Sequence, residues 1–147
     1  MFKLILAVVT VVSGAGLAAQ AIVNSQLRSL VGSGLVAAVT NNFVGLCALF
    51  FFLLISGQAT SLANLTQVPS TYLIGGLFGA VFVFVSTYAA KELGMLFFLA
   101  LVVSGQFVLA SLIDHFGWFG AEQQAFTIKR ALGVIALIAG AILVKLK

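Results

Sequence analysis

Long apolar stretches alternate with short polar breaks along this chain. Five windows are dominated by hydrophobic side chains, and a helix of about 20 such residues crosses a bilayer core of ~30 Å. They cover residues 4–23, 35–55, 72–90, 95–113 and 126–144. Glycine, proline and charged residues gather in the gaps between the windows, where turns are expected. The pattern predicts an all-α membrane protein that forms one five-helix domain over residues 1–147.

The first and fifth windows each allow a second interpretation. Lys3, the first apolar stretch and a small-residue site at 19–21 are typical of a signal peptide, but four further windows favour a retained first helix. In the fifth window, the stretch between Arg130 and Lys145 is only ~21 Å of helix at 1.5 Å per residue. Lys129 and Arg130 must therefore snorkel, or this helix begins earlier and the bilayer thins locally.

The composition excludes soluble classes of protein. Of the 147 residues, 63% are hydrophobic and 7% are charged, whereas a soluble domain has about 25% charged residues. So few charges cannot cover a water-facing surface, which excludes a soluble enzyme and a secreted disulfide scaffold. The net charge of +4 comes from scattered basic residues, so no nucleic-acid partner is expected. One cysteine (Cys47) and one histidine (His115) are too few for a metal centre, and no cofactor is expected.

Basic residues are divided almost equally between the two sides of the predicted bundle. With five spans, three lie on the N-terminal side and four on the opposite side: Lys3, Lys129 and Arg130 against Arg28, Lys91, Lys145 and Lys147. Orientation follows the Lys/Arg bias of short loops, and this bias is nearly zero. Either weak cues fix one orientation, or copies insert both ways and pair antiparallel, which would build an inverted repeat without gene fusion.

Polar side chains inside the windows concentrate in the half of the bundle opposite the N terminus. Because polar groups are costly in lipid, they normally face a protein interior or a watery cavity. We therefore expect a cavity that opens to that side and reaches the midplane. The predicted substrate-binding residues are Gln20, Asn24, Asn41 and Gln106. Hydrogen bonds that only tie helices together are the alternative for the amides, and Ser86, Thr87 and Ser104 are expected to bond back to their own helix carbonyls.

Three side chains are candidates for proton titration or gating. Glu92 follows the third window, where it either exchanges a proton for a cationic substrate or is simply an interfacial residue. Asp114 and His115 end the fourth window. A carboxylate at a helix C-terminus opposes the helix dipole, so we expect Lys129 or Arg130 to compensate Asp114. The aromatic segment that follows favours an interfacial anchor, with gating or proton handling as the alternative.

Small residues mark two helix faces. Gly75 and Gly79 have the GxxxG spacing in the third window, and Gly133 and Gly140 form a stripe on the fifth. Such spacing lets helix backbones approach closely in a membrane. Both faces are predicted to pack against other helices, and the stripe on the fifth helix is the expected homodimer contact.

With these residues in view, the chain resembles the YdcZ-like inner-membrane exporters of the drug/metabolite transporter superfamily. The matching features are residues 16–27, residues 75–80, Arg130 with Gly133 and, most specifically, Gly105-Gln106 followed by residues 110–117. The resemblance implies a bacterial inner-membrane protein, a five-helix unit that works as a pair, and a role in transport. The superfamily's small multidrug branch uses a first-helix glutamate, and the corresponding region here offers Gln20 and Asn24. Proton antiport by that route is therefore not expected.

The expected function is export of a small polar or cationic metabolite or drug. The protein would be a secondary transporter that works by alternating access, surrounded by lipid, as an antiparallel ten-helix homodimer or with a paralogous partner. A dual-topology ion channel is one alternative, which flux far above transporter turnover would favour. A non-transporting helical partner of another membrane complex is a second. No nucleophile–base pair can be assembled from the sequence, so no catalytic residue is predicted.

Overall fold

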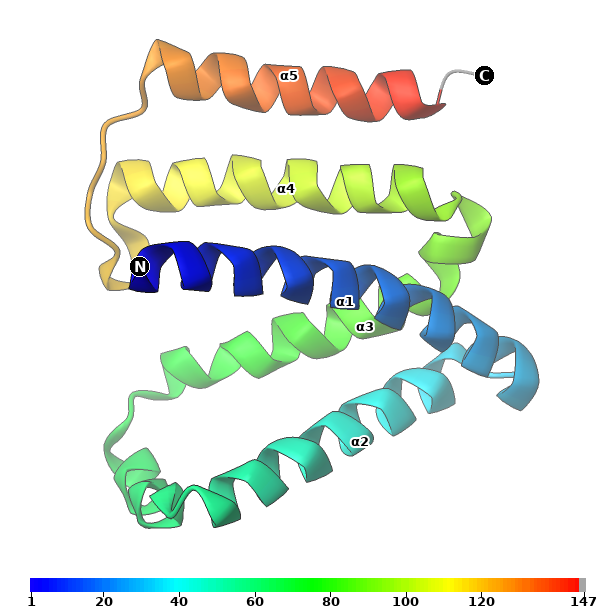
Figure 1. Cartoon of the computed structure of the whole chain (residues 1–147), viewed down its shortest axis with the longest axis vertical. Helices are drawn as coiled ribbons and strands as arrows, with labels where there is room; N and C mark the ends of the chain where they lie inside the picture. Colours follow the sequence, from blue (N-terminus) through cyan, green and yellow to red (C-terminus); the bar gives the residue numbers. More distant parts are fainter. Residues whose placement is uncertain (146–147) are drawn as a thin grey trace. The chain divides into compact units, whose positions relative to one another are not determined.

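The computed structural model describes residues 1–145, and within them it contains helices and short connections but no strand. Five α-helices follow one another along the chain (Figure 1): α1 (Phe2–Val31), α2 (Gly34–Ile55), α3 (Gly75–Glu92), α4 (Met95–Phe116) and α5 (Ile128–Lys145). Three short 3-10 segments connect them: η1 (Gln58–Gln67), η2 (Ser70–Ile74) and η3 (Trp118–Gly120). The all-α prediction is confirmed. Lys147, which entered the charge count, lies outside the described residues.

Four of the five helices are long and apolar enough to cross a membrane. They are α1, α2, the continuous segment Ser70–Glu92 that ends in α3, and α4. Helix α5 has 18 residues, and three of them are the basic residues Lys129, Arg130 and Lys145. Each predicted window therefore forms a helix, but the crossing of the membrane by α5 stays a prediction.

The connection between α1 and α2 is a two-residue turn with a clear local cause. Gly32 adopts a left-handed conformation with a φ of 71°, and its N–H donates to the carbonyl of Arg28 at 2.9 Å. Glycine suits this position because it has no Cβ to clash. The hydroxyl of Ser33 then accepts a hydrogen bond from the N–H of Val36 and caps α2. The chain turns back on itself at this point, so α2 packs against the end of α1.

The chain divides into two compact units. The first unit is Met1–Glu92, in which α1, α2 and α3 pack against one another. The second unit begins at Leu93, and in it α4 packs against α5. The prediction of one five-helix domain is neither supported nor excluded by this division.

The first unit is packed at one end only. Its buried residues all come from α1 after Gln20, the first turns of α2 and α3 after Phe82: Ala21, Asn24, Ser25, Gly34, Ala37, Ala38, Val83, Ser86, Thr87 and Ala90. Most have small side chains, which let the helix backbones approach closely. Every residue of α1 up to Leu17 is exposed, and α2 diverges from α1 toward its own C-terminus (Figure 1).

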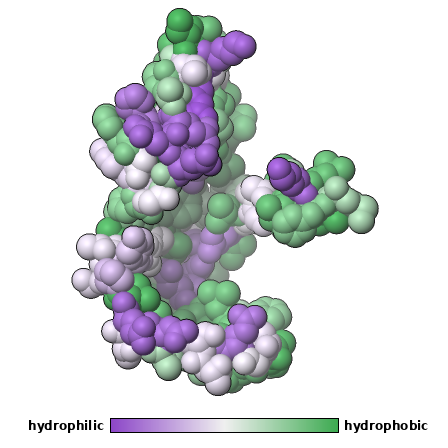
Figure 2. Space-filling view, turned by 90° about the vertical axis from the view of Figure 1, so that its left-hand side faces the viewer, coloured by the Kyte–Doolittle hydropathy of each residue, from purple (hydrophilic) through white to green (hydrophobic). Residues whose placement is uncertain are grey.

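The outer surfaces of the helices are apolar. Leucine, isoleucine, valine and phenylalanine side chains are exposed along all five helices. Figure 2 faces the side on which connecting segments lie, and there hydrophilic patches stand among hydrophobic ones. Exposed apolar patches of this extent are unfavourable in water. They fit the lipid surroundings that the sequence predicted.

Candidate functional site

A layer of polar side chains crosses the packed end of the first unit. Its members are Gln20, Asn24 and Ser25 of α1, Asn41 of α2, and Ser86 and Thr87 of α3. We call this set the polar layer. Asn24 is 3% exposed, and Ser25, Ser86 and Thr87 are buried as well. The packed end of the unit is therefore polar inside, although its outer surface is apolar.

One hydrogen bond within the polar layer joins α1 to α2. The side-chain nitrogen of Gln20 donates to Oδ1 of Asn41 at 2.9 Å. The next residue, Asn42, is exposed and donates instead to the carbonyl of Ala38 on its own helix. A bond of this kind between membrane helices contributes ~0.6–2 kcal/mol. Three of the four predicted substrate residues, Gln20, Asn24 and Asn41, thus belong to one packed unit.

Asn24 has an unpaired donor in this layer. The hydroxyl groups of Ser86 and Thr87 donate to the carbonyls of Val83 and Phe84, both at 2.7 Å, as predicted from the sequence. Within residues 1–145, Nδ2 of Asn24 is the buried side-chain nitrogen that lacks a hydrogen-bond partner. A buried donor without a partner costs ~1–3 kcal/mol. The fold therefore carries a local defect at Asn24 that a ligand or a water molecule would relieve.

Next to the polar layer, the side chain of Arg28 stacks on the ring of Tyr88. The guanidinium carbon of Arg28 lies 3.9 Å from the ring centroid of Tyr88. The same ring rests on Gly34, where an added Cβ would overlap its carbons and its hydroxyl group. Phe84 meets Tyr88 edge-on, with the ring centroids 5.5 Å apart. One tyrosine ring thus brings α1, α2 and α3 together.

The substrate-binding residues predicted from the sequence did not include Arg28, Gly34 or Tyr88. A usable signal was present for one of them, because Gln20, Asn24 and Arg28 are spaced four residues apart and such residues share one helix face. The contact of Tyr88 with Gly34 joins residues far apart in the sequence, and no local pattern predicts it.

Glu92 lies beside Arg28 and is only loosely held. Its Oε1 is 4.0 Å from Nη1 of Arg28, and the side chains of Glu92 and Arg28 are 69% and 28% exposed. Lys91 donates to the hydroxyl of Ser29 at 3.5 Å. Exposed ion pairs at such distances contribute little to stability. The roles in titration or gating that the sequence suggested for Glu92 stay predictions.

Within the described residues the polar half of the first unit is closed, and the expected opening of this half stays a prediction. The polar layer lies where the three helices pack, and the helices diverge at the other end. The physical reason is the small size of the buried side chains, which lets this end close. A groove of about 370 Å³ does run between α2 and α3, but its lining is mostly apolar, with Asn42 among the lining residues.

Gln106, the fourth predicted substrate residue, belongs to the second unit. It is exposed on α4, and no hydrogen bond of its side chain is found within the described residues. Ser104, two residues earlier, donates to the carbonyl of Ala100 at 2.8 Å, as predicted. Gln106 therefore offers an unengaged amide on the surface of α4.

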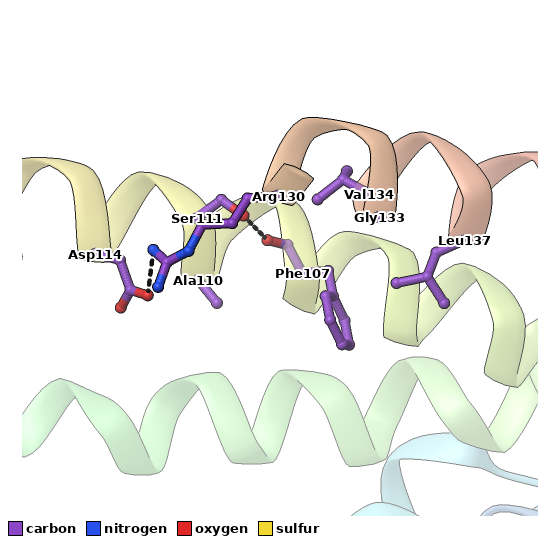
Figure 3. Close-up of a pocket in the computed structure, with 8 residues that line it drawn as sticks. All are labelled: Phe107, Ala110, Ser111, Asp114, Arg130, Gly133, Val134 and Leu137. Atoms are coloured by element: carbon purple, nitrogen blue, oxygen red, sulfur yellow. Dashed lines mark hydrogen bonds and ion pairs between the residues drawn. The ribbon is translucent and has the colours of Figure 1, made fainter. Parts of the chain in front are cut away.

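Asp114, Gln124 and Arg130 of the second unit are paired with one another. Nη1 of Arg130 donates to Oδ2 of Asp114 at 3.2 Å, and the same guanidinium donates to the side chain of Gln124. The backbone N–H of Gln124 donates a hydrogen bond to the carbonyl of Asp114 at 2.7 Å. The predicted compensation of Asp114 is confirmed, with Arg130 as the partner. In Figure 3 this pair lies at one end of a groove of about 320 Å³ between α4 and α5, and Phe107 and Leu137 line its apolar part.

His115 ties the connecting segment to α4. Its Nδ1 accepts a hydrogen bond from the N–H of Phe126 at 3.4 Å, and its carbonyl accepts one from the side chain of Gln123 at 3.0 Å. Its ring meets Phe116 edge-on, and Phe116 stacks on Trp118. These contacts favour the anchoring interpretation of the segment over gating or proton handling.

The predicted packing glycines differ in their surroundings. A Cβ added at Gly75 or Gly79 would meet no other atom within 4 Å, so no close helix approach uses this GxxxG face in the described chain. Gly133 and Gly140 line grooves between α5 and α4. The small-residue stripe of α5 therefore has a neighbour within its own unit, and its role in a homodimer stays a prediction.

Apolar helices of membrane-spanning length, and a buried polar layer within the first unit, define a multi-pass membrane protein with a candidate solute site. Within residues 1–145, no three His, Cys, Asp or Glu side chains are close enough to hold a metal ion. A family model described as "Putative inner membrane exporter, YdcZ" matches residues 5–143. The chain belongs to this inner-membrane family, which is one of exporters rather than enzymes. No curated protein and no solved structure matches the chain.

Proposed function

We propose that this protein is a secondary transporter that exports a small polar solute by alternating access. The observation that carries the proposal is the unpaired, buried amide of Asn24 inside membrane helices of an exporter family. Polar groups at such depth are costly and usually have a functional role. A solute that accepts a hydrogen bond from Asn24 would recover part of this cost.

The proposed solute surface is the polar layer. Asn24 is its central contact, and Gln20 and Asn41 contribute the amide atoms that their mutual hydrogen bond leaves free. Gln106 is proposed as a further contact, presented by α4. In this proposal the stack of Arg28 on Tyr88 is the closed gate of one conformation, because it seals the packed end of α1, α2 and α3.

We also propose that two copies pair antiparallel. An inverted copy would present its packed end to the opposite side of the membrane, as alternating access requires. The nearly even division of basic residues supports insertion in both orientations. The Gly75–Gly79 face of α3, which has no close neighbour in the described chain, is available for a partner. A paralogue inserted in the opposite orientation would serve the same purpose.

Topology in intact cells tests the pairing and the fifth span together. Cys47 is replaced by alanine, and two single-cysteine variants are made from that background. One is Ser61→Cys in η1, which is exposed, and the other carries a cysteine appended after Lys147. Each is labelled with a membrane-impermeant thiol reagent before and after permeabilisation. Five spans place the two cysteines on opposite sides of the membrane, whereas four spans place them on the same side.

Dual topology predicts that about half of the chains of each variant react from outside. Complete labelling of one variant and none of the other would mean five spans in a single orientation. Equal, complete labelling or equal absence of labelling would mean four spans in a single orientation. Either single-orientation result excludes the antiparallel homodimer, and a search for an oppositely oriented partner would follow.

Transport itself is tested with purified protein in liposomes and a panel of radiolabelled polar solutes. We expect saturable flux of a solute that is lost in Asn24→Leu and in Gln106→Ala, with unchanged elution from size-exclusion chromatography. Flux that far exceeds transporter turnover and depends little on temperature would favour a channel. A stable complex with another membrane protein, together with no flux by the chain alone, would favour a helical partner.

A further inference from the structure

We propose that Asn24 and Arg28 form a site for the carboxylate of a small organic anion. This assigns a charge class to the substrate and so rests on the proposed transport function. The site itself is a binding site, however, and binding is measured independently of flux.

The first argument is an excess of hydrogen-bond donors. Nδ2 of Asn24 is buried without a partner, and no hydrogen bond of the Arg28 side chain is found within the described residues. The 4.0 Å between Arg28 and Glu92 is longer than a hydrogen bond, which rarely exceeds ~3.2 Å for N–H···O. Asn24 and Arg28 are one helical turn apart on the same face of α1. A ligand for this pair must bring acceptor atoms, as a carboxylate does.

The second argument is the orientation of the guanidinium. Arg28 stacks on Tyr88 at 3.9 Å, so a face of the planar group is engaged with the ring. Stacking leaves the N–H groups at the edge of the plane free, and that edge matches the two oxygens of a carboxylate. Tyr88 is in turn fixed by its contact with Gly34. The donor fork is therefore held in place before a ligand arrives, which reduces the entropy cost of binding.

The third argument is the local balance of charge. Arg28, Lys91 and Glu92 are the charged residues of the first unit near its packed end, and two of the three are cations. An organic cation would be repelled by Arg28 and an organic anion would be attracted. Glu92, which is mostly exposed and beyond hydrogen-bond distance, can move away from Arg28 at little cost. It would act as an internal competitor for the anion.

Binding is measured on the full-length purified protein with benzoate as the probe. Benzamide, which has the same ring and no charge, is the matched control, and ionic strength is held constant. The readout is the ligand-dependent shift in thermal unfolding in detergent. We expect saturable stabilisation by benzoate and none by benzamide.

Three substitutions locate the site. Arg28→Gln should weaken benzoate binding by about tenfold or more, because it removes a charge-assisted pair. Arg28→Lys, which keeps the charge and loses the planar fork, should weaken it by a smaller factor. Glu92→Gln should tighten binding by ~2–5-fold, because it removes the competing carboxylate. A gain of affinity cannot come from misfolding, so Glu92→Gln keeps the test valid if the Arg28 variants fold poorly.

Equal responses to benzoate and benzamide, or benzoate binding that is unchanged in Arg28→Gln and in Glu92→Gln, would overturn the proposal. An anionic lipid headgroup shares the chemistry of the probe, so the titration is repeated in nanodiscs. If binding seen in phosphatidylcholine is abolished when phosphatidylglycerol is included, the site belongs to lipid and the solute assignment is wrong. Benzoate binding without flux of any carboxylate would leave the site intact and contradict the transport function instead.

Discussion

The cluster around Asp114 in the second unit and the groups around Asn24 in the first unit differ in how fully their hydrogen bonds are satisfied. In the second unit, Asp114, Arg130 and Gln124 satisfy one another, and His115 fixes the connecting segment. In the first unit, Nδ2 of the buried Asn24 has no partner, and the side chain of Arg28 is stacked on Tyr88 but makes no hydrogen bond within the described residues. Mutual pairing is typical of groups that hold a structure together. Buried hydrogen-bond donors without a partner are typical of groups that bind a ligand.

The largest loss of stability among the variants considered is expected for a substitution of Gly34. Gly34→Ala places a Cβ in steric overlap with Cε2 of Tyr88, and overpacking of this kind costs ~1–3 kcal/mol or more. We expect a lower unfolding temperature and reduced recovery of folded protein. Gly45→Ala is the matched control on the same helix, because a Cβ there meets nothing within 4 Å, and alanine favours a helix over glycine by ~1 kcal/mol. Equal behaviour of the two variants would mean that the ring does not rest on Gly34.

A smaller loss is expected when the pair in the second unit is broken. Asp114→Asn removes the charge that Arg130 faces at 3.2 Å. Both side chains are more than a third exposed, so solvent screening reduces the expected loss to about 1 kcal/mol. Thermal unfolding measures it. Lys129→Ala, which removes a neighbouring cation with no ion pair among the described residues, should change stability little. If Lys129→Ala lost more stability than Asp114→Asn, Lys129 and not Arg130 would be the residue that compensates Asp114.

The smallest effect is expected for the bond that joins α1 to α2. A double-mutant cycle of Gln20→Ala and Asn41→Ala should give a coupling free energy of ~0.6 kcal/mol, the average for such bonds in membranes. Unfolding of the wild type, both single variants and the double variant measures this coupling. A coupling near zero would mean that the amides are held apart in solution, and both would then be available to a solute.

Much of the local structure could be predicted, because its causes are local. Apolar runs of membrane length predicted all five helices. The hydrogen bonds of serine and threonine to carbonyls of their own helix follow from the short reach of a hydroxyl side chain. The compensation of Asp114 followed from the helix dipole, although the choice of Arg130 over Lys129 depended on how α5 packs on α4.

The rest depends on contacts between residues distant in the sequence. The stack of Arg28 on Tyr88 requires α1 and α3 to pack, and its support by Gly34 requires α2 as well. Polarity alone indicated a cavity in this half, but it did not indicate that small buried side chains let the three helices pack closely there. For α5, hydropathy and charge give opposing signals, so its position relative to the membrane cannot be read from the pattern.

The account is tested most directly by the stability of Asn24→Leu, with Asp114→Leu measured beside it. Leucine is close to asparagine in size and removes an unpaired buried donor, so Asn24→Leu should unfold at the wild-type temperature or above it. Asp114→Leu should unfold at a lower temperature, because it removes a paired group. Benzoate stabilisation should be lost in Asn24→Leu and kept in Asp114→Leu. A marked loss of stability in Asn24→Leu would show that Asn24 holds the fold together, and it would contradict the assignment of the polar layer as a binding site.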